Sequence, residues 1–518
     1  MNGAHSLIRT LLDSGVDVCF MNPGTSEMHF VAALDDEPEM RGVLALFEGV
    51  ATGAADGYAR MAERPAATLL HLGPGLGNGL ANLHNARRAH SPVVNIVGDH
   101  ATYHKQYDAQ LESDIETVAR NVSGWIRTSE STQALPADAA QAVAVAAGPP
   151  GQVATLILPA DVSWSEDAVP APLAPTAEPE EVDTDLVSTL AEILQGDEPA
   201  ALFVGGRACR ADALVDASRV ANATGAQLLA ETFPARLERG AGRVPVERLG
   251  YLAEFAALQL DGLAHLILVD AKSPVSFFAY PGRASDLVPE GCQVHVLAGP
   301  EGDPAAALAA LADAIGAPAD GATIQPPARP ELPTGPLTAD AVCQAVGALL
   351  PEDAIVSDEG NTSGLFAAGH TAGAPPHDWL CLTGGAIGQG LPVAVGAAVA
   401  APERQVIALQ ADGSAMYTLQ AWWTMAREQL DVVTIVFNNS SYAVLNMELS
   451  RVGATAGGEK AKAMLDLHAP DLDFVALATG MGVPATRATT SEEFVAQLQT
   501  ALATSGPSVI EAVVPSIM

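Results

Sequence analysis

Short runs of apolar residues recur along the chain, and longer amphipathic stretches separate them. Strands that are apolar on both faces and alternate with helices are typical of parallel sheets covered by helices. Ligands bind beyond the carboxyl ends of the strands in such sheets. The pattern therefore predicts an α/β protein. The runs are VDVCFM, AATLLHL, VVNIVG and VATLIL in the first third, AALFVGG, AQLLAE, HLILVD and QVHVLAG in the middle, and AIVSDEG, QVIALQAD, VVTIVFNN and PSVIEAVV in the last.

Two stretches break this pattern and divide the chain. Residues 165–183 and 316–336 are rich in Pro, Ala and acidic residues and lack apolar periodicity, as linkers do. A chain of 518 residues is also too long for one ordinary core. We therefore expect three doubly wound parallel-sheet domains, at 1–164, 184–315 and 337–518.

Composition narrows the classes of function. Hydrophobic residues make up 49% of the chain and charged residues 17%, as in a compact globular protein. The net charge of −36 argues against a nucleic-acid partner, because phosphate backbones need a basic surface. The five cysteines are scattered without a CxxC pair, which argues against structural zinc and a disulfide framework. We find no signal peptide and no apolar run long enough for a bilayer, and expect a cytoplasmic protein without a membrane partner.

A candidate metal and phosphate site lies in the last third. The run QVIALQ ends at Asp412, and the next run ends at Asn439, so both residues fall at the carboxyl ends of consecutive parallel strands. Their carboxylate and amide oxygens suit Mg²⁺ or Ca²⁺. Gly413 and Ser414 begin a predicted helix, AMYTLQAWWTMARE, whose free N–H groups suit a phosphate. As an alternative, DGS taken alone would be a plain strand-to-helix turn. The second strand that ends in NN at this spacing favours the metal site over that alternative.

Glycines near Ile387, in TGGAIGQGLP, would let the backbone approach a ligand closely. Neither this stretch nor FVGGRA in the middle block forms the GxGxxG fingerprint. Its absence argues against a nicotinamide-dependent oxidoreductase.

A second candidate site lies near the start of the chain. Glu48 follows the apolar run GVLALF and begins a helix rich in Ala and Gly, either as an acid–base group in an apolar setting or as a charge at the helix N-terminus. His71 ends a predicted strand and enters what we expect to be a glycine-rich loop, LGPGLGN, where a site role is favoured over a packed core histidine. His100 and His104, in the loop DHATYHKQYD, are weaker candidates for substrate contact.

These motifs together resemble the thiamine-diphosphate-dependent family of acetolactate synthase, benzoylformate decarboxylase and pyruvate decarboxylase. Five stretches carry the resemblance in the right order across essentially the whole chain: NPGTSE from Asn22, the motif E-x-x-A-x-x-x-A-D-G-Y-A-R from Glu48, LGPGLGN from Leu72, AIGQGLP, and DGS followed by NN. The resemblance implies a pyrimidine-binding domain, a central domain and a diphosphate-binding domain.

The resemblance also implies roles for single residues. Asp412 and Asn439 would bind Mg²⁺ by their side chains and Ser441 by its carbonyl. Glu48 would hydrogen-bond the cofactor's pyrimidine from a partner subunit, which implies a homodimer or homotetramer with active sites at the subunit interface. The other implied contacts to the cofactor are from Asn361 and Thr362 near the diphosphate, the Gly385 carbonyl, the bulky Ile387, and Gly413 and Ser414.

The implied activity is decarboxylation of a 2-oxo acid, giving an aldehyde or, by carboligation, a 2-hydroxyketone. Thr25 and His71 fall where benzoylformate decarboxylase has active-site residues, and Val444, Leu445 and Glu448 are candidates for the substrate pocket. Several features depart from the family pattern: Ala411 replaces a glycine, SPVSFFAYPG lacks a second histidine, and the central domain has no recognisable flavin site. Two alternatives stay open, a C–C lyase of the same family that releases no CO₂ and a non-catalytic paralogue.

Overall fold

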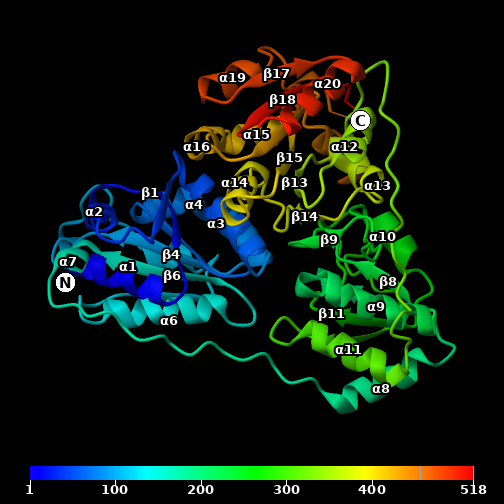
Figure 1. Ribbon diagram of the computed structural model, residues 1–518, viewed down its shortest axis with the longest axis horizontal. Coiled ribbons are helices and arrows are strands. Elements are labelled where there is room, and N and C mark those ends of the chain that lie inside the picture. Colours follow the sequence, from blue (N-terminus) through cyan, green and yellow to red (C-terminus); the bar gives the residue numbers. More distant parts are fainter. Residues whose placement is uncertain (455–456, 517–518) are drawn as a thin grey trace.

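The chain forms three lobes, each built on one β-sheet (Figure 1). The computed structural model describes residues 1–454 and 457–516. The N-terminal lobe is blue to cyan, the central lobe green, and the C-terminal lobe yellow to red. Residues 165–183 run in extended form from the first lobe to α8 (Thr184–Leu194). Three sheets dominated by parallel strands confirm the predicted fold class.

The N-terminal sheet has six parallel strands in the order β2-β1-β3-β4-β6-β5. Helix α3, which Glu48 begins, packs on one face together with α4, and α1 and α6 pack on the other. The elements are α1 (Gly3–Asp13), β1 (Val18–Asn22), α2 (Met28–Ala33), β2 (Arg41–Leu44), α3 (Glu48–Ala62), β3 (Ala66–Leu70), α4 (Leu72–Arg88), β4 (Val93–Asp99), α5 (Ile115–Ala119), β5 (Trp125–Thr128), α6 (Leu135–Ala147), β6 (Val153–Pro159) and α7 (Ala160–Trp164).

The central sheet has five parallel strands in the order β10-β8-β7-β11-β12. Strand β9 lies between β8 and β10 in the sequence but belongs to the C-terminal sheet. The elements of the central lobe after α8 are β7 (Ala200–Val204), α9 (Ala211–Thr224), β8 (Gln227–Ala230), β10 (Glu247–Arg248), α10 (Ala253–Leu260), β11 (His265–Val269), β12 (Gln293–Ala298) and α11 (Pro304–Ile315).

The C-terminal sheet has seven strands in the order β17-β18-β16-β15-β13-β14-β9. Strand β9 (Leu237–Arg239) comes from the middle of the sequence and pairs antiparallel with β14. The sheet is therefore mixed at this edge, and it includes a strand from outside the block 337–518. Its other elements are α12 (Ala339–Leu349), β13 (Ile355–Glu359), α13 (Ala367–His370), β14 (His377–Cys381), α14 (Gly390–Ala400), β15 (Val406–Ala411), α15 (Asp412–Thr418), α16 (Ala421–Glu428), β16 (Val432–Asn438), α17 (Ala443–Arg451), α18 (Glu459–Ala463), α19 (Phe474–Gly480), β17 (Ala485–Ala488), α20 (Ser491–Leu502) and β18 (Ser508–Val513).

The lobes share their cores. One apolar cluster joins the central and C-terminal lobes, and another joins the N-terminal and C-terminal lobes where α3 packs on α14. Glycines permit this close helix packing: a Cβ added at Gly57 would lie 2.2 Å from the Val393 carbonyl oxygen, and one at Gly396 would lie 1.9 Å from that of Ala54. The N-terminal lobe is thus fixed against the C-terminal lobe.

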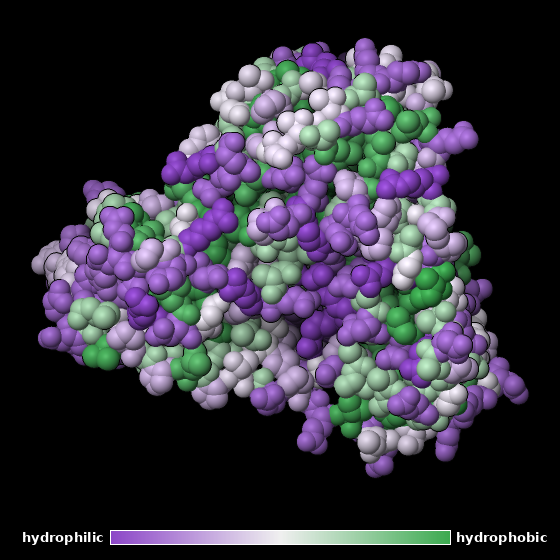
Figure 2. Space-filling model, in the orientation of Figure 1, coloured by the Kyte–Doolittle hydropathy of each residue, from purple (hydrophilic) through white to green (hydrophobic). Residues whose placement is uncertain are grey.

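Hydrophilic residues cover much of the face seen in Figure 2, with apolar patches between them. Among the described residues, no helix has both the length and the apolar character needed to cross a bilayer. The five cysteines are all free.

Candidate active site

The predicted metal residues meet at one edge of the C-terminal sheet, because β15 and β16 are neighbours. Asp412 is buried, and each of its oxygens accepts backbone hydrogen bonds. The N–H of Gly413 donates to Oδ1 at 2.7 Å, and those of Asn439 and Ser440 donate to Oδ2 at 2.9 and 2.6 Å. Ser440 turns the chain with φ +51°. The carboxylate is therefore fixed in place at the carboxyl ends of two strands.

This edge offers hard oxygen atoms. Burial raises the pKa of the Asp412 carboxyl, and the hydrogen bonds from backbone N–H groups lower it. Asn439 Oδ1 accepts the N–H of Ser441 at 3.0 Å, so the amide oxygen is oriented by the backbone. No group of three or more His, Cys, Asp or Glu side chains that could hold a metal occurs among residues 1–454 and 457–516. One carboxylate with amide and carbonyl oxygens fits Mg²⁺, which keeps water and phosphate as its other ligands.

Two further predicted segments lie beside this edge. Asn439 Nδ2 donates to Ser363 Oγ at 3.3 Å, which places the turn of Asn361 and Thr362 next to the metal residues. Asn361 has φ +48° and Gly385 has φ +72°, so both segments turn sharply. Ile387 is only half-buried and follows Gly385 in the second turn. Asn361 and Thr362, which were expected near the diphosphate, thus lie beside the metal residues, and the turn of Gly385 and Ile387 contacts α15 through Thr418.

The predicted helix after Gly413 is two helices. Helix α15 begins at Asp412 and ends at Thr418, and α16 begins at Ala421. Thr418 Oγ1 donates to the Gly388 carbonyl at 2.9 Å, so α15 ends against the turn that contains Ile387.

Glu48 and His71 lie together at the carboxyl edge of the N-terminal sheet. The stretch LGPGLGN, expected as a loop, is the first part of α4. Glycine has a poor helix propensity, but here it lets other groups approach the helix closely. A Cβ added at Gly75 would lie 3.1 Å from Glu48 Oε1 and 3.5 Å from His71 Cβ. Asn78 Nδ2 donates to Glu48 Oε2 at 3.0 Å. Glu48 and His71 thus flank one glycine of α4.

Glu27 lies beside His71 but was not among the predicted site residues. Its side chain is fully buried, and its Oε2 lies 2.8 Å from His71 Nδ1 and accepts the Gly24 N–H at 2.7 Å. Burial raises the pKa of Glu27, whereas the Gly24 N–H and His71 lower it. A carboxylate bonded to one ring nitrogen fixes the imidazole tautomer and its orientation. The signal was present in NPGTSE, from which only Thr25 was selected.

Thr25, His100 and His104 lie on the same side of the N-terminal lobe. Thr25 is exposed, two residues before Glu27. The His100 ring lies 5.3 Å from that of His104, centroid to centroid. A cavity of about 430 Å³ opens at this edge, but neither histidine lines it. Its lining includes Asp99, Lys105, Glu112, Ser113 and Ile157.

The candidate pocket residues Val444, Leu445 and Glu448 lie on α17. Leu445 is exposed, whereas Glu448 is held by the central lobe through a 2.9 Å hydrogen bond from the Tyr280 hydroxyl. Arg451 lies over the Tyr280 ring, 4.6 Å from its centroid. Its guanidinium also forms a bidentate pair with Glu254 at 3.0 and 2.9 Å. Helix α17 is therefore fixed to the central lobe.

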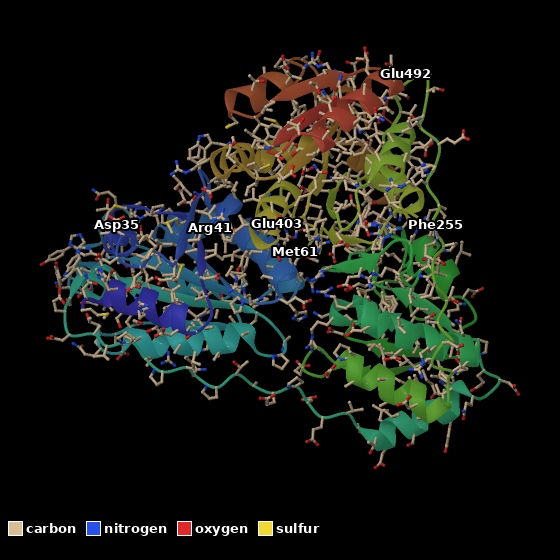
Figure 3. All side chains as sticks on the ribbon, in the orientation of Figure 1. Asp35, Arg41, Met61, Phe255, Glu403 and Glu492 are labelled. Atoms are coloured by element: carbon tan, nitrogen blue, oxygen red, sulfur yellow. The ribbon has the colours of Figure 1, made fainter. Side chains whose placement is uncertain are left out.

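Two residues of the ADGYAR motif join the three lobes. Asp56 and Arg60 form a buried bidentate ion pair, with nitrogen–oxygen distances of 2.8 and 2.6 Å. The remaining Arg60 N–H groups donate to the carbonyls of Ala235 and Cys381 and to Thr383 Oγ1. Figure 3 labels Met61, the next residue, near the centre of the molecule. This part of the motif therefore holds the fold together.

In the central lobe, the stretch FVGGRA turns at Gly206, and the backbone N–H groups of this turn already donate hydrogen bonds. Gly206 donates to Glu231 Oε1 at 3.0 Å, and the Arg207 backbone donates to Asp270 Oδ2 at 2.7 Å. Burial raises the pKa of Glu231 to about 7 and that of Asp270 to about 6. The two carboxylates take the N–H groups that would otherwise face a phosphate.

Known proteins match this chain over its whole length. Residues 1–119 match the thiamine pyrophosphate enzyme N-terminal TPP binding domain, and residues 358–512 match the C-terminal TPP binding domain. The chain is 61% identical, over all of both chains, to the "Putative acetolactate synthase large subunit IlvX" of Mycobacterium tuberculosis. It is 32% identical to benzoylformate decarboxylase of Pseudomonas aeruginosa, over 99% of this chain and 98% of that one.

The fold matches solved structures equally well. A thiamine diphosphate-dependent 4-hydroxybenzoylformate decarboxylase of Rhodococcus jostii superposes with a TM-score of 0.86, at 26% identity and 99% coverage of both chains. The match to both cofactor-binding domains, the relatives and the grouped site residues lead to one conclusion. The chain belongs to the thiamine-diphosphate-dependent enzyme family that includes acetolactate synthase and benzoylformate decarboxylase.

Proposed function

We propose that the protein is a Mg²⁺- and thiamine-diphosphate-dependent enzyme that decarboxylates a 2-oxo acid and releases an aldehyde or joins the product to a second carbonyl. The observation that carries this proposal is the fixed carboxylate of Asp412 beside Asn439, at the edge where the diphosphate residues gather. The relatives are named as enzymes of 2-oxo acid chemistry, which supports the same reaction class.

In this proposal each residue has a stated task. Asp412, Asn439 and the Ser441 carbonyl would hold Mg²⁺, and the turns of Asn361 and Ile387 would hold the cofactor. When bound, the cofactor supplies an electron sink for the carbon–carbon bond that breaks. Glu48 would hydrogen-bond the cofactor's pyrimidine and hold a proton there. His71, oriented by Glu27, moves a proton at the reacting carbonyl oxygen.

We further propose that two chains complete each site, with Glu48 of one chain facing the metal edge of the other. Exposed large apolar side chains at both edges support this arrangement, because such patches mark interfaces. A twofold axis would bring the N-terminal edge of each chain against the C-terminal edge of the other. The exposed residues are Met28, Leu46, Tyr103 and Tyr107 at the first edge and Leu365, Phe366, Tyr417 and Leu445 at the second. A cytoplasmic location is part of the proposal, and the five free cysteines support it.

The test of the reaction is CO₂ release from a panel of 2-oxo acids, with thiamine diphosphate and Mg²⁺ present and with aldehyde and 2-hydroxyketone products measured separately. Glu48→Gln should lose most turnover and still bind the cofactor. Glu63→Gln, at the other end of the same helix, should behave as the wild type. Product without CO₂ would instead indicate a C–C lyase, and no turnover of any acid by the loaded wild type would indicate a non-catalytic paralogue.

Subunit sharing has its own test. Glu48→Gln and Asp412→Asn are each expected to be inactive. If two chains build each site, mixed and reassembled variants should recover about a quarter of wild-type activity, because half of the dimers are mixed and each has one intact site. A mixture as inactive as its components would contradict shared sites.

A further inference from the structure

Glu359 ends β13 and is 2% exposed. Its carboxylate lies between two segments that the proposed function assigns to the cofactor, namely the turn of Ile387 and the start of α15. Strand β13 is placed between β14 and β15 in the sheet, so its last residue can reach both segments. No step of the proposed reaction uses this side chain.

Each carboxylate oxygen of Glu359 accepts two hydrogen bonds. The N–H groups of Gly388 and Gln389 donate to Oε1 at 2.6 and 3.3 Å. The N–H of Gly390 and Nε2 of Gln410 donate to Oε2 at 2.8 and 2.9 Å. An amide offers only one acceptor atom, and a protonated carboxyl turns one oxygen into a donor, so four donors match the ionised carboxylate. Burial raises the pKa of Glu359 above its usual value, and these hydrogen bonds oppose that rise by stabilising the ionised form.

Gln410 extends the contact to the start of α15. Its Nε2 also donates to Ser414 Oγ at 2.6 Å, so one amide joins Glu359 to the serine of the DGS motif. The Gln410 Oε1 atom is buried and has no hydrogen-bond partner within the described part of the chain. Leaving a buried acceptor unpaired costs free energy, so the carboxylate dictates which way the amide points.

The turn of Ile387 is also held from its other side. Gln389 Nε2 donates to Asp56 Oδ2 at 3.0 Å, and Asp56 lies on α3, the helix that Glu48 begins. Space around the turn is limited, since a Cβ added at Gly390 would lie 2.8 Å from Glu359 Cβ. The turn is therefore held from several sides. Thr418 joins it to the end of α15, and Glu359, through Gln410, joins it to the start of that helix.

We propose that Glu359 is a positioning residue that sets the distance between the turn of Ile387 and the phosphate-binding start of α15. The proposal rests on the proposed function. With only one acceptor oxygen at position 359, an N–H of the turn or the amide of Gln410 loses its partner. The contact of Thr418 with the turn remains, but the start of α15 at Ser414 is no longer tied to the turn of Ile387. Binding of the whole cofactor needs both segments, whereas binding of a free diphosphate needs only the metal edge.

The test compares two ligands on cofactor-free protein by titration calorimetry, Mg²⁺ with thiamine diphosphate and Mg²⁺ with inorganic pyrophosphate. Glu359→Gln keeps the side-chain volume and removes the charge. We expect the affinity for thiamine diphosphate to fall about 10- to 100-fold, as expected for losing hydrogen bonds to a charged group. The affinity for pyrophosphate should change less than about threefold.

Two variants complete the test. Gln410→Met cuts the link to Ser414 and should show a smaller loss that is again confined to thiamine diphosphate; it carries the test if Glu359→Gln does not fold. Asp138→Asn removes another buried carboxylate, which accepts from Arg127 and Ser129 in the N-terminal lobe, and should leave both affinities unchanged. Equal thiamine diphosphate affinity in the wild type and Glu359→Gln overturns the proposal, and so does an equal loss for both ligands. A wild type that binds no thiamine diphosphate refutes the proposed function instead.

Discussion

The ion pair of Asp56 and Arg60 predicts how strongly the three lobes depend on one side chain. In Arg60→Met, the methionine fills much of the volume of the arginine stem but cannot donate to Asp56 or to the carbonyls of Ala235 and Cys381. Asp56 is fully buried, so its charge would stay in the core, and Ser91 and Gln389 would be its remaining donors among the described residues. The variant therefore loses the pair and retains the desolvation cost of the carboxylate.

Breaking a buried ion pair by removing one partner costs about 3–5 kcal/mol. If the 518 residues unfold as one unit, the entropy of unfolding is about 1.1 kcal/mol/K, and the melting temperature should fall by about 3–5 °C. Because Arg60 contacts all three lobes, the single transition should also broaden or split. Asp56→Asn combined with Arg60→Met should be less destabilised than Arg60→Met alone, because the unpaired charge is gone.

Differential scanning calorimetry measures the melting temperatures of the wild type, Arg60→Met, the double variant and the matched control Arg64→Met. Arg64 also pairs with an aspartate, Asp17, but both side chains are nearly half exposed, so its loss should cost less than about 1 kcal/mol. A melting temperature for Arg60→Met within 1 °C of the wild type would contradict this role of the ion pair, and so would an equal loss of stability in Arg64→Met.

Three further predictions concern the metal edge, Glu27 and the central lobe. Dialysis against EDTA should release thiamine diphosphate, and full cofactor retention in metal-free protein would contradict the metal site. Asp412→Asn should weaken Mg²⁺-dependent cofactor binding about tenfold or more, as measured by titration. Glu27→Gln should lower kcat about tenfold or more without changing cofactor affinity, because His71 loses its carboxylate partner. Glu37 is also a buried carboxylate, paired with Arg9, and Glu37→Gln should leave kcat unchanged. An unchanged kcat in Glu27→Gln would rule out the orienting role. The folded-state pKa of Glu231 is raised to about 7, so the stability that its neutral form contributes is present below about pH 4.5 and is lost as the pH rises through 7. Between pH 5 and 8 the free energy of unfolding of Glu231→Gln should therefore rise relative to that of the wild type by about 1–3 kcal/mol. Equal pH profiles of the two proteins in thermal melts would count against this.

Most of the fold could be predicted because its strands are apolar on both faces. The twelve apolar runs all contain strands, at β1, β3, β4, β6, β7, β8, β11, β12, β13, β15, β16 and β18. Strand β9 has three residues and carries no such pattern. The glycines of α4 suggested a loop, because the local propensity does not report the packing of Gly75 against Glu48.

The site residues were predictable where a motif keeps them close in sequence. Asp412, Asn439 and Ser441 follow two strand ends, and the neighbouring strands bring them together. The pair of Glu27 and His71 spans 44 positions and forms only because β1 and β3 lie side by side. The contact of Glu448 with Tyr280 likewise depends on how two lobes meet, which no local pattern encodes.

Strand β9 limits how this enzyme can be recombined with its relatives. It lies inside the middle third of the sequence but belongs to the C-terminal sheet, where it covers the edge of the buried strand β14. A chimera that exchanged residues 184–315 as a block would carry a foreign strand into that sheet, or leave the backbone of β14 open to pairing with other chains. Recombination within this family should therefore succeed when Leu237–Arg239 is inherited together with His377–Cys381, so the units of exchange are defined by sheet pairing and not by linkers.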